Sequence, residues 1–347
     1  MDGRYGNSSA TCRVSACKSV RVERDNRHMR LSATHQSNRE QSQVLKQAVD
    51  NIPEPIRQMR RQTQRRSRGH GTVMLCLMLL LLVVVPVAME ARHLQKWSTV
   101  NRPAPGTPRV FGSYTAGCLQ GAVPLPAEGP GFQSMYRARK RFFGHPTLVH
   151  FVRDLGNVVA TQGWGVLNIG DLGQARGGPT PYGHRSHQTG LDVDIWFWLA
   201  DHPGALTDAE RESLQAPSML TPDRRALDPD RWSTRHVHLL QTAAAFPVVE
   251  RIFVHPRMKQ TLCQQAPGAA WLRKIRPWWG HDDHFHVRLR CTAGEADCVS
   301  QAPLPEGTGC DASLTWWLSA EAQRPPAPGG LPQVQLPQAC WELLKQD

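Results

Sequence analysis

The sequence predicts an α+β fold, with a small antiparallel sheet core, flanking helices and long loops. Helical and strand-like segments are mixed along the chain without the regular β-α-β rhythm of a doubly wound parallel sheet. Gly and Pro number 28 and 27 among the 347 residues, so loops should be plentiful. The hydrophobic content of 40% is ordinary for a globular protein.

The expected elements lie in a folded body over residues 116–320. Helices are expected where apolar residues recur at helical spacing, and strands where short runs are apolar or alternate. The expected helices cover 147–159, 235–245 and 256–263, and the expected strands cover 167–171, 191–198, 249–254 and 284–290. Prolines indicate a linker over 92–115 and an extended tail over 321–347 that ends in an apolar turn.

Most of the basic charge lies in an N-terminal extension. Residues 1–71 carry 15 Lys and Arg against 6 Asp and Glu, whereas residues 92–347 carry 26 against 22. Because the folded part is nearly balanced, the net charge of +12 does not indicate nucleic-acid binding, and no nucleic-acid partner is expected. Residues 1–58 are polar and predict a disordered basic extension. Met59 begins a segment with the proportions of a complete signal peptide, so the extension could be a start-site artefact.

An uncharged apolar run of 16 residues covers Val73–Ala88 and follows a cluster of arginines. This order is typical of a secretory signal, and the run is shorter than the roughly 20 residues of a spanning helix. Residues 59–91 are interpreted as a signal peptide or, because a clear A-x-A cleavage site is lacking, as a retained membrane anchor. A buried core helix is the third alternative. Either of the first two exports the folded part, and a membrane would be contacted only through residues 73–88.

Six of the nine cysteines follow this run: Cys118, Cys263, Cys291, Cys298, Cys310 and Cys340. An even number in an exported chain favours three disulfide bonds. Six cysteines allow 15 pairings, and composition does not choose among them. Buried free thiols are the alternative.

The segment 183–197 contains the first group of candidate site residues. Asp192 and Asp194 alternate with apolar residues, so a half-buried strand presents carboxylates on one face. His187 precedes Gly190, which can form a tight turn and bring the imidazole over that face. The pattern predicts a carboxylate and an imidazole at one site.

The segment 280–290 adds two histidines, His284 and His286, on one face of a second strand. A catalytic zinc ion favours three N or O ligands and a fourth, open position. His187, Asp194 and His286 could supply these ligands. His284 would then be available as a general base or oxyanion stabiliser, for which its near-neutral pKa is suited.

The same residue types also have ordinary structural uses. A lone H-x-H pair is a weak signal, and a second one, His236-Val237-His238, falls in an expected helix where residues i and i+2 do not face each other. Aspartates in strands often pair with arginine, and His184 and His281 could be polar loop residues. The coincidence of two histidine-rich strands in an exported chain favours the metal site.

The segment Ser186–Asp194 (SHQTGLDVD), together with His284–His286, resembles the LAS metallopeptidases, and most closely the penicillin-insensitive murein endopeptidases. The resemblance runs from about Ser113 to the C-terminus, roughly two-thirds of the chain. Matching stretches include Gly117-Cys118, Phe143-Gly144-His145-Pro146, Gly177-Gly178, Arg251-Ile252-Phe253-Val254, Arg276-Pro277-Trp278 and His286-Val287-Arg288-Leu289-Arg290-Cys291.

The resemblance implies a LAS-like metallopeptidase catalytic domain over 116–320. It implies that Zn²⁺ is bound by His187, Asp194 and His286. It further implies that His284 is the catalytic base or stabiliser, and that His184 and His281 line the site, near a second metal or the substrate.

The resemblance also implies the disulfide pairs Cys118–Cys340, Cys263–Cys310 and Cys291–Cys298, the first of which would tie back the Pro-rich tail. Two neighbouring acids, Asp282 and Asp283, depart from the family pattern and should raise the pKa of His284 by charge attraction.

The implied function is zinc-dependent hydrolysis of the D-alanyl–meso-diaminopimelyl cross-links of peptidoglycan in the periplasm, with cross-linked muropeptides as the partner. Alternatives are a D-Ala-D-Ala carboxypeptidase, a non-catalytic peptidoglycan-binding module, and a nucleic-acid binder built on the basic extension. The intact ligand set with His284 argues against the binding module. The sequence leaves the oligomeric state, signal cleavage and regulation open.

Overall fold

The computed structural model describes residues 96–181, 185–322, 324 and 335–346. The predicted basic extension and the apolar run over residues 73–88 lie outside these residues. Within the described part, no helix has the length and apolar character needed to cross a membrane.

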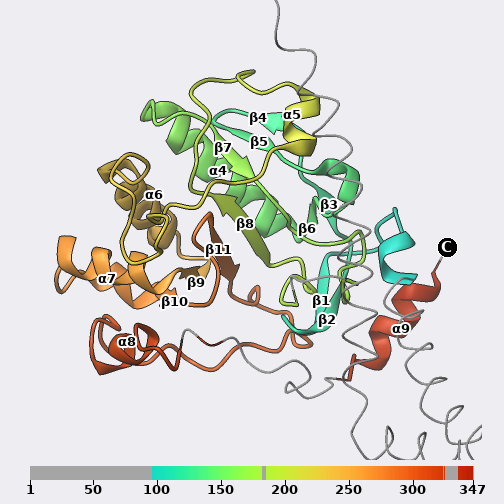
Figure 1. Ribbon diagram of the computed structural model, residues 1–347. Coiled ribbons are helices and arrows are strands. Elements are labelled where there is room, and N and C mark those ends of the chain that lie inside the picture. The colour runs from blue at the N-terminus through green and yellow to red at the C-terminus, as the bar shows by residue number, and fades with distance from the viewer. Residues whose placement is uncertain (1–95, 182–184, 323, 325–334, 347) are drawn as a thin grey trace, which may run out of the picture. The chain divides into compact units, whose positions relative to one another are not determined.

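In the described residues, seven strands form the central sheet in the order β10-β9-β11-β8-β7-β5-β4 (Figure 1). The strands are β4 (Glu128–Gly129), β5 (Phe132–Ser134), β7 (Leu167–Ile169), β8 (Asp192–Trp196), β9 (Val249–Val254), β10 (Ile275–Pro277) and β11 (His284–Leu289). The pairs at the centre, β9–β11, β11–β8 and β8–β7, are antiparallel. The pairs β9–β10 and β5–β7 are parallel, and each is connected through a helix, as a crossover between parallel neighbours requires.

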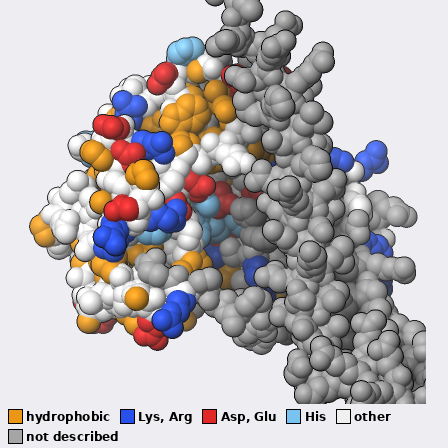
Figure 2. Space-filling view, in the orientation of Figure 1, with side chains coloured by type: hydrophobic (Ala, Val, Ile, Leu, Met, Phe, Trp, Pro, Cys, Tyr) orange, Lys and Arg blue, Asp and Glu red, His pale blue; other side chains and the backbone are white. Residues whose placement is uncertain are grey.

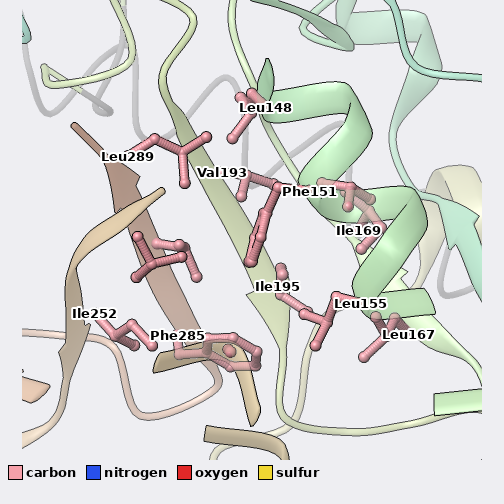
Figure 3. Packing of buried hydrophobic residues seen from close by; sticks show 14 of the residues in the cluster. Leu148, Phe151, Leu155, Leu167, Ile169, Val193, Ile195, Ile252, Phe285 and Leu289 are labelled. Atoms are coloured by element: carbon pink, nitrogen blue, oxygen red, sulfur yellow. The ribbon is translucent and has the colours of Figure 1, made fainter. Parts of the chain in front are cut away.

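One face of this sheet is apolar and covered by helices α4 (Pro146–Thr161) and α6 (Thr234–Ala245). Figure 3 shows Phe151 of α4 beside Val193 of β8, and Phe285 of β11 further along in the same buried cluster. All three side chains are buried. The polar residues that alternate with them therefore lie on the opposite face.

The long predicted elements coincide with α4, α6, α7 (Pro256–Gln265), β7, β8, β9 and β11, apart from one or two residues at their ends. The short elements were not predicted. They are β1 (Arg109–Ser113), β2 (Ala116–Gln120), β3 (Val123–Pro124), β6 (Phe143–Gly144), α5 (Asp208–Ser213), α8 (Ala312–Trp317) and the 3₁₀ turns Arg137–Arg139 and Ala270–Lys274, besides β4, β5 and β10. Because β1 pairs with β2, the folded part begins within the segment predicted as a linker.

Among the described cysteines there are three disulfide bonds, Cys118–Cys340, Cys263–Cys310 and Cys291–Cys298. These are the pairs that the family resemblance implies. The first ties α9 (Gln338–Lys345) to β2, where Trp97, Leu343 and Leu344 form a small apolar cluster around it.

The glycine-rich loop 174–178 links this cluster to the polar side of the sheet. The Arg176 guanidinium donates to the Leu343 carbonyl at 2.6 Å, near the end of α9. The Arg176 carbonyl accepts from Leu119 of β2, and Gly178 N donates to the Gln188 carbonyl at 2.9 Å. Both ends of the described chain thus support the residues beside His187.

Candidate metal centre

The two strands predicted to carry the site are neighbours in the sheet. β8 and β11 pair with His286 opposite Asp194 and Arg288 opposite Asp192. Since side chains alternate along a strand, this register places both polar rows on the face away from α4. Figure 2 shows histidine and acidic side chains gathered near the middle of the described surface.

His187, Asp194 and His286 are buried, and one potential ligand atom from each lies within 4.8 Å of the others. Asp194 Oδ1 is 3.4 Å from His187 Nε2 and 3.0 Å from His286 Nδ1. His187 reaches this position from a turn that ends at Gly190, whose φ is +65°. A Cβ at Gly190 would lie 2.5 Å from Leu119 Cδ2, so both the backbone and the space require glycine.

The second nitrogen of each imidazole is held by the protein. His187 Nδ1–H donates to the Leu172 carbonyl, and His286 Nε2–H donates to Asp192 Oδ1, each at 2.5 Å. Their other nitrogens therefore present lone pairs toward Asp194. Two lone pairs and a carboxylate oxygen facing one point require a cation or a proton between them. The donor set, two imidazoles and one carboxylate, fits a catalytic zinc ion with an open position.

The proton-binding tendency of His286 reflects the same arrangement. Burial lowers the pKa of His286, but the hydrogen bonds that its protonated ring would donate to Asp192 and Asp194 outweigh burial and raise the pKa. The protein thus favours positive charge at the point where the three side chains meet.

Asp192 is a further site residue whose role was not predicted. It is fully buried and also accepts from Arg288 Nε at 2.8 Å. Burial raises the pKa of Asp192, but Arg288 and the His286 hydrogen bond lower it below its usual value. Asp192 is therefore an ionised carboxylate that fixes the orientation of His286. The alternation of β8 placed it on the polar face, but its partner depended on the strand register.

His284 lies beside the three candidate ligands. Its Nδ1 is 2.5 Å from Asp283 Oδ1, and its Nε2 is 3.7 Å from Asp194 Oδ1. Burial lowers the pKa of His284, but Asp194 and the hydrogen-bonded Asp283 raise it to about 9. The direction is the one predicted from the neighbouring acids. Asp282, the other acid, forms its hydrogen bonds with Arg224 at 3.0 Å and with Ser218.

His281 also lies at this site. Its ring centroid is 4.9 Å from that of His284 and 5.8 Å from that of His286, and its Nδ1 lies 2.8 Å from the Trp279 carbonyl. Burial and the two neighbouring histidines lower the pKa of His281 to about 3. His184 lies outside the described residues. The structure therefore brings together five of the six predicted site residues.

Comparison with known proteins identifies the family. The family described as penicillin-insensitive murein endopeptidase matches residues 110–345. A penicillin-insensitive murein endopeptidase of Klebsiella pneumoniae is 41% identical over 256 residues, covering 72% of this chain and 91% of the relative. The protein of the same name from Haemophilus influenzae is 40% identical over 259 residues, covering 72% and 87%. The chain belongs to the penicillin-insensitive murein endopeptidase family.

The match to this murein endopeptidase family begins in β1 and ends in α9, and so contains the whole described site and all three disulfide bonds. Residues before 110, including the basic extension, lie outside the match.

Proposed function

We propose that this chain is a zinc-dependent endopeptidase that hydrolyses the D-alanyl–meso-diaminopimelyl cross-links of murein. The observation that best supports this proposal is that His187, Asp194 and His286 converge on one point beside His284. The chain in which they do so belongs to a murein endopeptidase family. The names of the relatives indicate murein as the substrate, and the candidate ligand set indicates metal-dependent hydrolysis as the reaction.

The proposed ligands are His187, Asp194 and His286, and a zinc ion bound to them would supply Lewis-acid polarisation of the scissile carbonyl and activation of water. Asp192 would keep Nδ1 of His286 directed at the ion. His284 would hold and transfer a proton at Nε2, because Asp283 engages its Nδ1.

The electrostatics of His284 agree with this role. Asp194 and Asp283 raise its pKa to about 9. A cation bound by Asp194 would offset that carboxylate's attraction and bring the pKa of His284 closer to neutrality, where proton transfer in both directions is efficient. His281, with its low pKa, would remain neutral beside it.

An exported location is part of the proposal. Three disulfide bonds are typical of proteins that fold in oxidising compartments. For a murein hydrolase that compartment is the periplasm, where the cross-links lie.

The test uses purified protein and cross-linked muropeptide dimers. We expect about one zinc ion per chain, dimer cleavage to monomers, no release of terminal D-Ala from D-Ala-D-Ala peptides, and loss of activity in chelator. Release of terminal D-Ala instead would favour a carboxypeptidase. Full activity after verified metal removal would exclude the metal mechanism.

Two variants separate ligand from proton carrier. His286→Ala should lose both zinc and activity, whereas His284→Ala should keep zinc and lose roughly 10²–10⁴-fold in turnover. Zinc loss in His284→Ala with zinc retained in His286→Ala would reverse these two roles.

A further inference from the structure

An aromatic surface extends from the candidate metal centre to α8. Phe253 of β9 stands opposite His286 of β11, and their ring centroids are 5.5 Å apart. The Trp278 ring follows at 5.9 Å from Phe253, and the Trp317 ring at 5.7 Å from Trp278. Three ring-to-ring contacts therefore connect a candidate zinc ligand to the end of α8.

Four tryptophans from two separate segments build this surface, which we call the aromatic platform: Trp278, Trp279, Trp316 and Trp317. Trp279 packs on Trp317 at 4.5 Å, and Trp316 packs on Trp317 at 5.1 Å between centroids. The disulfide bond Cys263–Cys310 anchors the start of α8 to α7. Trp279 Nε1 donates to the Ala322 carbonyl just after α8. The disulfide bond and this hydrogen bond therefore hold the four rings in position before any ligand binds.

Two members of the platform are open to solvent. Among the described residues, the exposed large hydrophobic side chains are Trp278 at 46%, Trp316 at 43% and Val299 at 58%. Single exposed apolar side chains are common, but half-exposed indoles that belong to one packed group of four form a candidate binding surface. Its ring-to-ring connection to the candidate metal centre indicates that the occupant is part of the molecule being cut.

We propose that the aromatic platform binds the glycan strand of murein, through the rings of its N-acetylated hexosamines. This inference rests on the proposed function. One face of a pyranose ring presents C–H groups, which pack against the electron-rich face of an indole, while the indole N–H can donate to a sugar oxygen. Flat, rigid and partly polar aromatic rings match such a ligand better than they match a flexible aliphatic one.

The dimensions of the substrate are compatible with this assignment. The peptide that carries the scissile bond is attached to a sugar of the glycan strand. A stem of about four residues spans at most about 14 Å when extended. Trp278, the first member of the aromatic platform, lies two ring contacts, of 5.5 and 5.9 Å, from His286. A peptide cut at the metal centre can therefore place its own sugar at Trp278, from which the glycan strand can continue along the platform.

The test compares two substrates in the full chain loaded with zinc. One is a cross-linked peptide dimer without sugars, and the other is the same dimer with its disaccharides. Trp316→Ala should raise KM for the sugar-bearing dimer about 3- to 10-fold and leave its kcat unchanged, as expected for the loss of one stacking contact. It should change neither constant for the sugar-free dimer, which also verifies that the variant is folded.

Two further variants identify the kind of contact. Trp316→Tyr keeps a flat ring and should restore most of the affinity, whereas Trp316→Leu keeps apolar area without a π face and should behave as Trp316→Ala. Equal affinity of Trp316→Leu and the unaltered protein for the sugar-bearing dimer would overturn the stacking proposal.

The remaining outcomes are distinct. If the unaltered protein cuts both dimers with the same KM and Trp316→Ala changes neither, the platform does not bind glycan although the proposed function stands. If the unaltered protein cuts neither dimer, the proposed function itself fails. A loss of self-association or of vesicle binding in Trp316→Ala, with its sugar dependence unchanged, would assign the platform to a second copy or to a membrane and overturn the proposal.

Discussion

Replacing Asp192 by Asn should weaken zinc binding without removing a candidate ligand. The buried carboxylate accepts from His286 Nε2 at 2.5 Å and from Arg288 Nε at 2.8 Å. Asn preserves the volume and one acceptor, but it removes the charge that fixes the His286 tautomer and makes Nδ1 more basic. Losing such an orienting partner lowers metal affinity about 10–100-fold, or about 1.4–2.7 kcal/mol.

The same substitution should lower the free energy of unfolding, because Arg288 is 5% exposed and loses its anionic partner. Removing one partner of a buried ion pair costs about 3–5 kcal/mol. Arg288 keeps its hydrogen bond to Gln301 at 2.8 Å and its position 3.6 Å over the Tyr114 ring. We therefore expect a loss near the lower end, about 3 kcal/mol.

Competition with a chromophoric chelator measures the zinc affinity, and urea unfolding in excess chelator measures stability without the contribution of bound metal. Asp282→Asn is the matched control. Asp282 also lies near the site, but it bonds to Arg224 and Ser218, so its variant should bind zinc normally. If Asp192→Asn and Asp282→Asn bind zinc with affinities within about threefold of each other, the orienting role of Asp192 is refuted.

Three predictions concern stability, and urea unfolding tests each. Replacing both Cys118 and Cys340 by Ala should lower the free energy of unfolding by about 2–5 kcal/mol. This loss should exceed that from replacing Cys291 and Cys298, because the first bond spans a sequence separation of 222 and the second one of 7. A larger loss for the short loop would contradict the loop-length argument. Leu155→Ala should lower the free energy of unfolding by about 2–5 kcal/mol, because it opens a cavity under α4. Asp154→Ala, at the exposed neighbouring position, should change the free energy of unfolding by no more than about 0.5 kcal/mol. Equal effects of the two substitutions would refute the packing assignment. Burial lowers the pKa of Lys259 to about 7 from an ordinary 10.5, so between these values the unfolded chain binds more protons at this residue, and Lys259 contributes a stability that rises with pH by at most about 1.4 kcal/mol per unit. His284, whose pKa is raised to about 9, contributes in the opposite direction in both proteins. The difference in stability between the unaltered protein and Lys259→Met should therefore rise with pH, and a constant difference would refute the assignment.

The sequence predicted the parts of the fold whose patterns are long. α4 and β11 extend over enough residues for a period to emerge, and the alternation of β8 placed Asp194 on the polar face. Strands of two or three residues, such as β4 and β10, carry too little pattern to be recognised.

The site was predictable as a set of residue types but not as an arrangement. Spacing could not show that Asp194 would face His286 rather than its neighbour along the strand, because the register results from tertiary packing. For the same reason the contact from Asp192 to His286 was missed. The aromatic platform joins residues 278–279 to residues 316–317, and no local pattern connects such distant segments.

The position of α9 has a consequence for when the protein becomes able to act. Arg176 has its hydrogen-bond partner on α9, and Cys118 its disulfide partner, only after α9 has been synthesised and has packed beside β2. The loop beside His187 therefore depends on a segment far from it in the sequence and on a disulfide bond that requires oxidising conditions. A chain that lacks α9, or in which Cys118 and Cys340 are reduced, would lack this support beside the candidate ligands. The packing of α9 and the formation of this disulfide bond are therefore conditions for the full assembly of the candidate site.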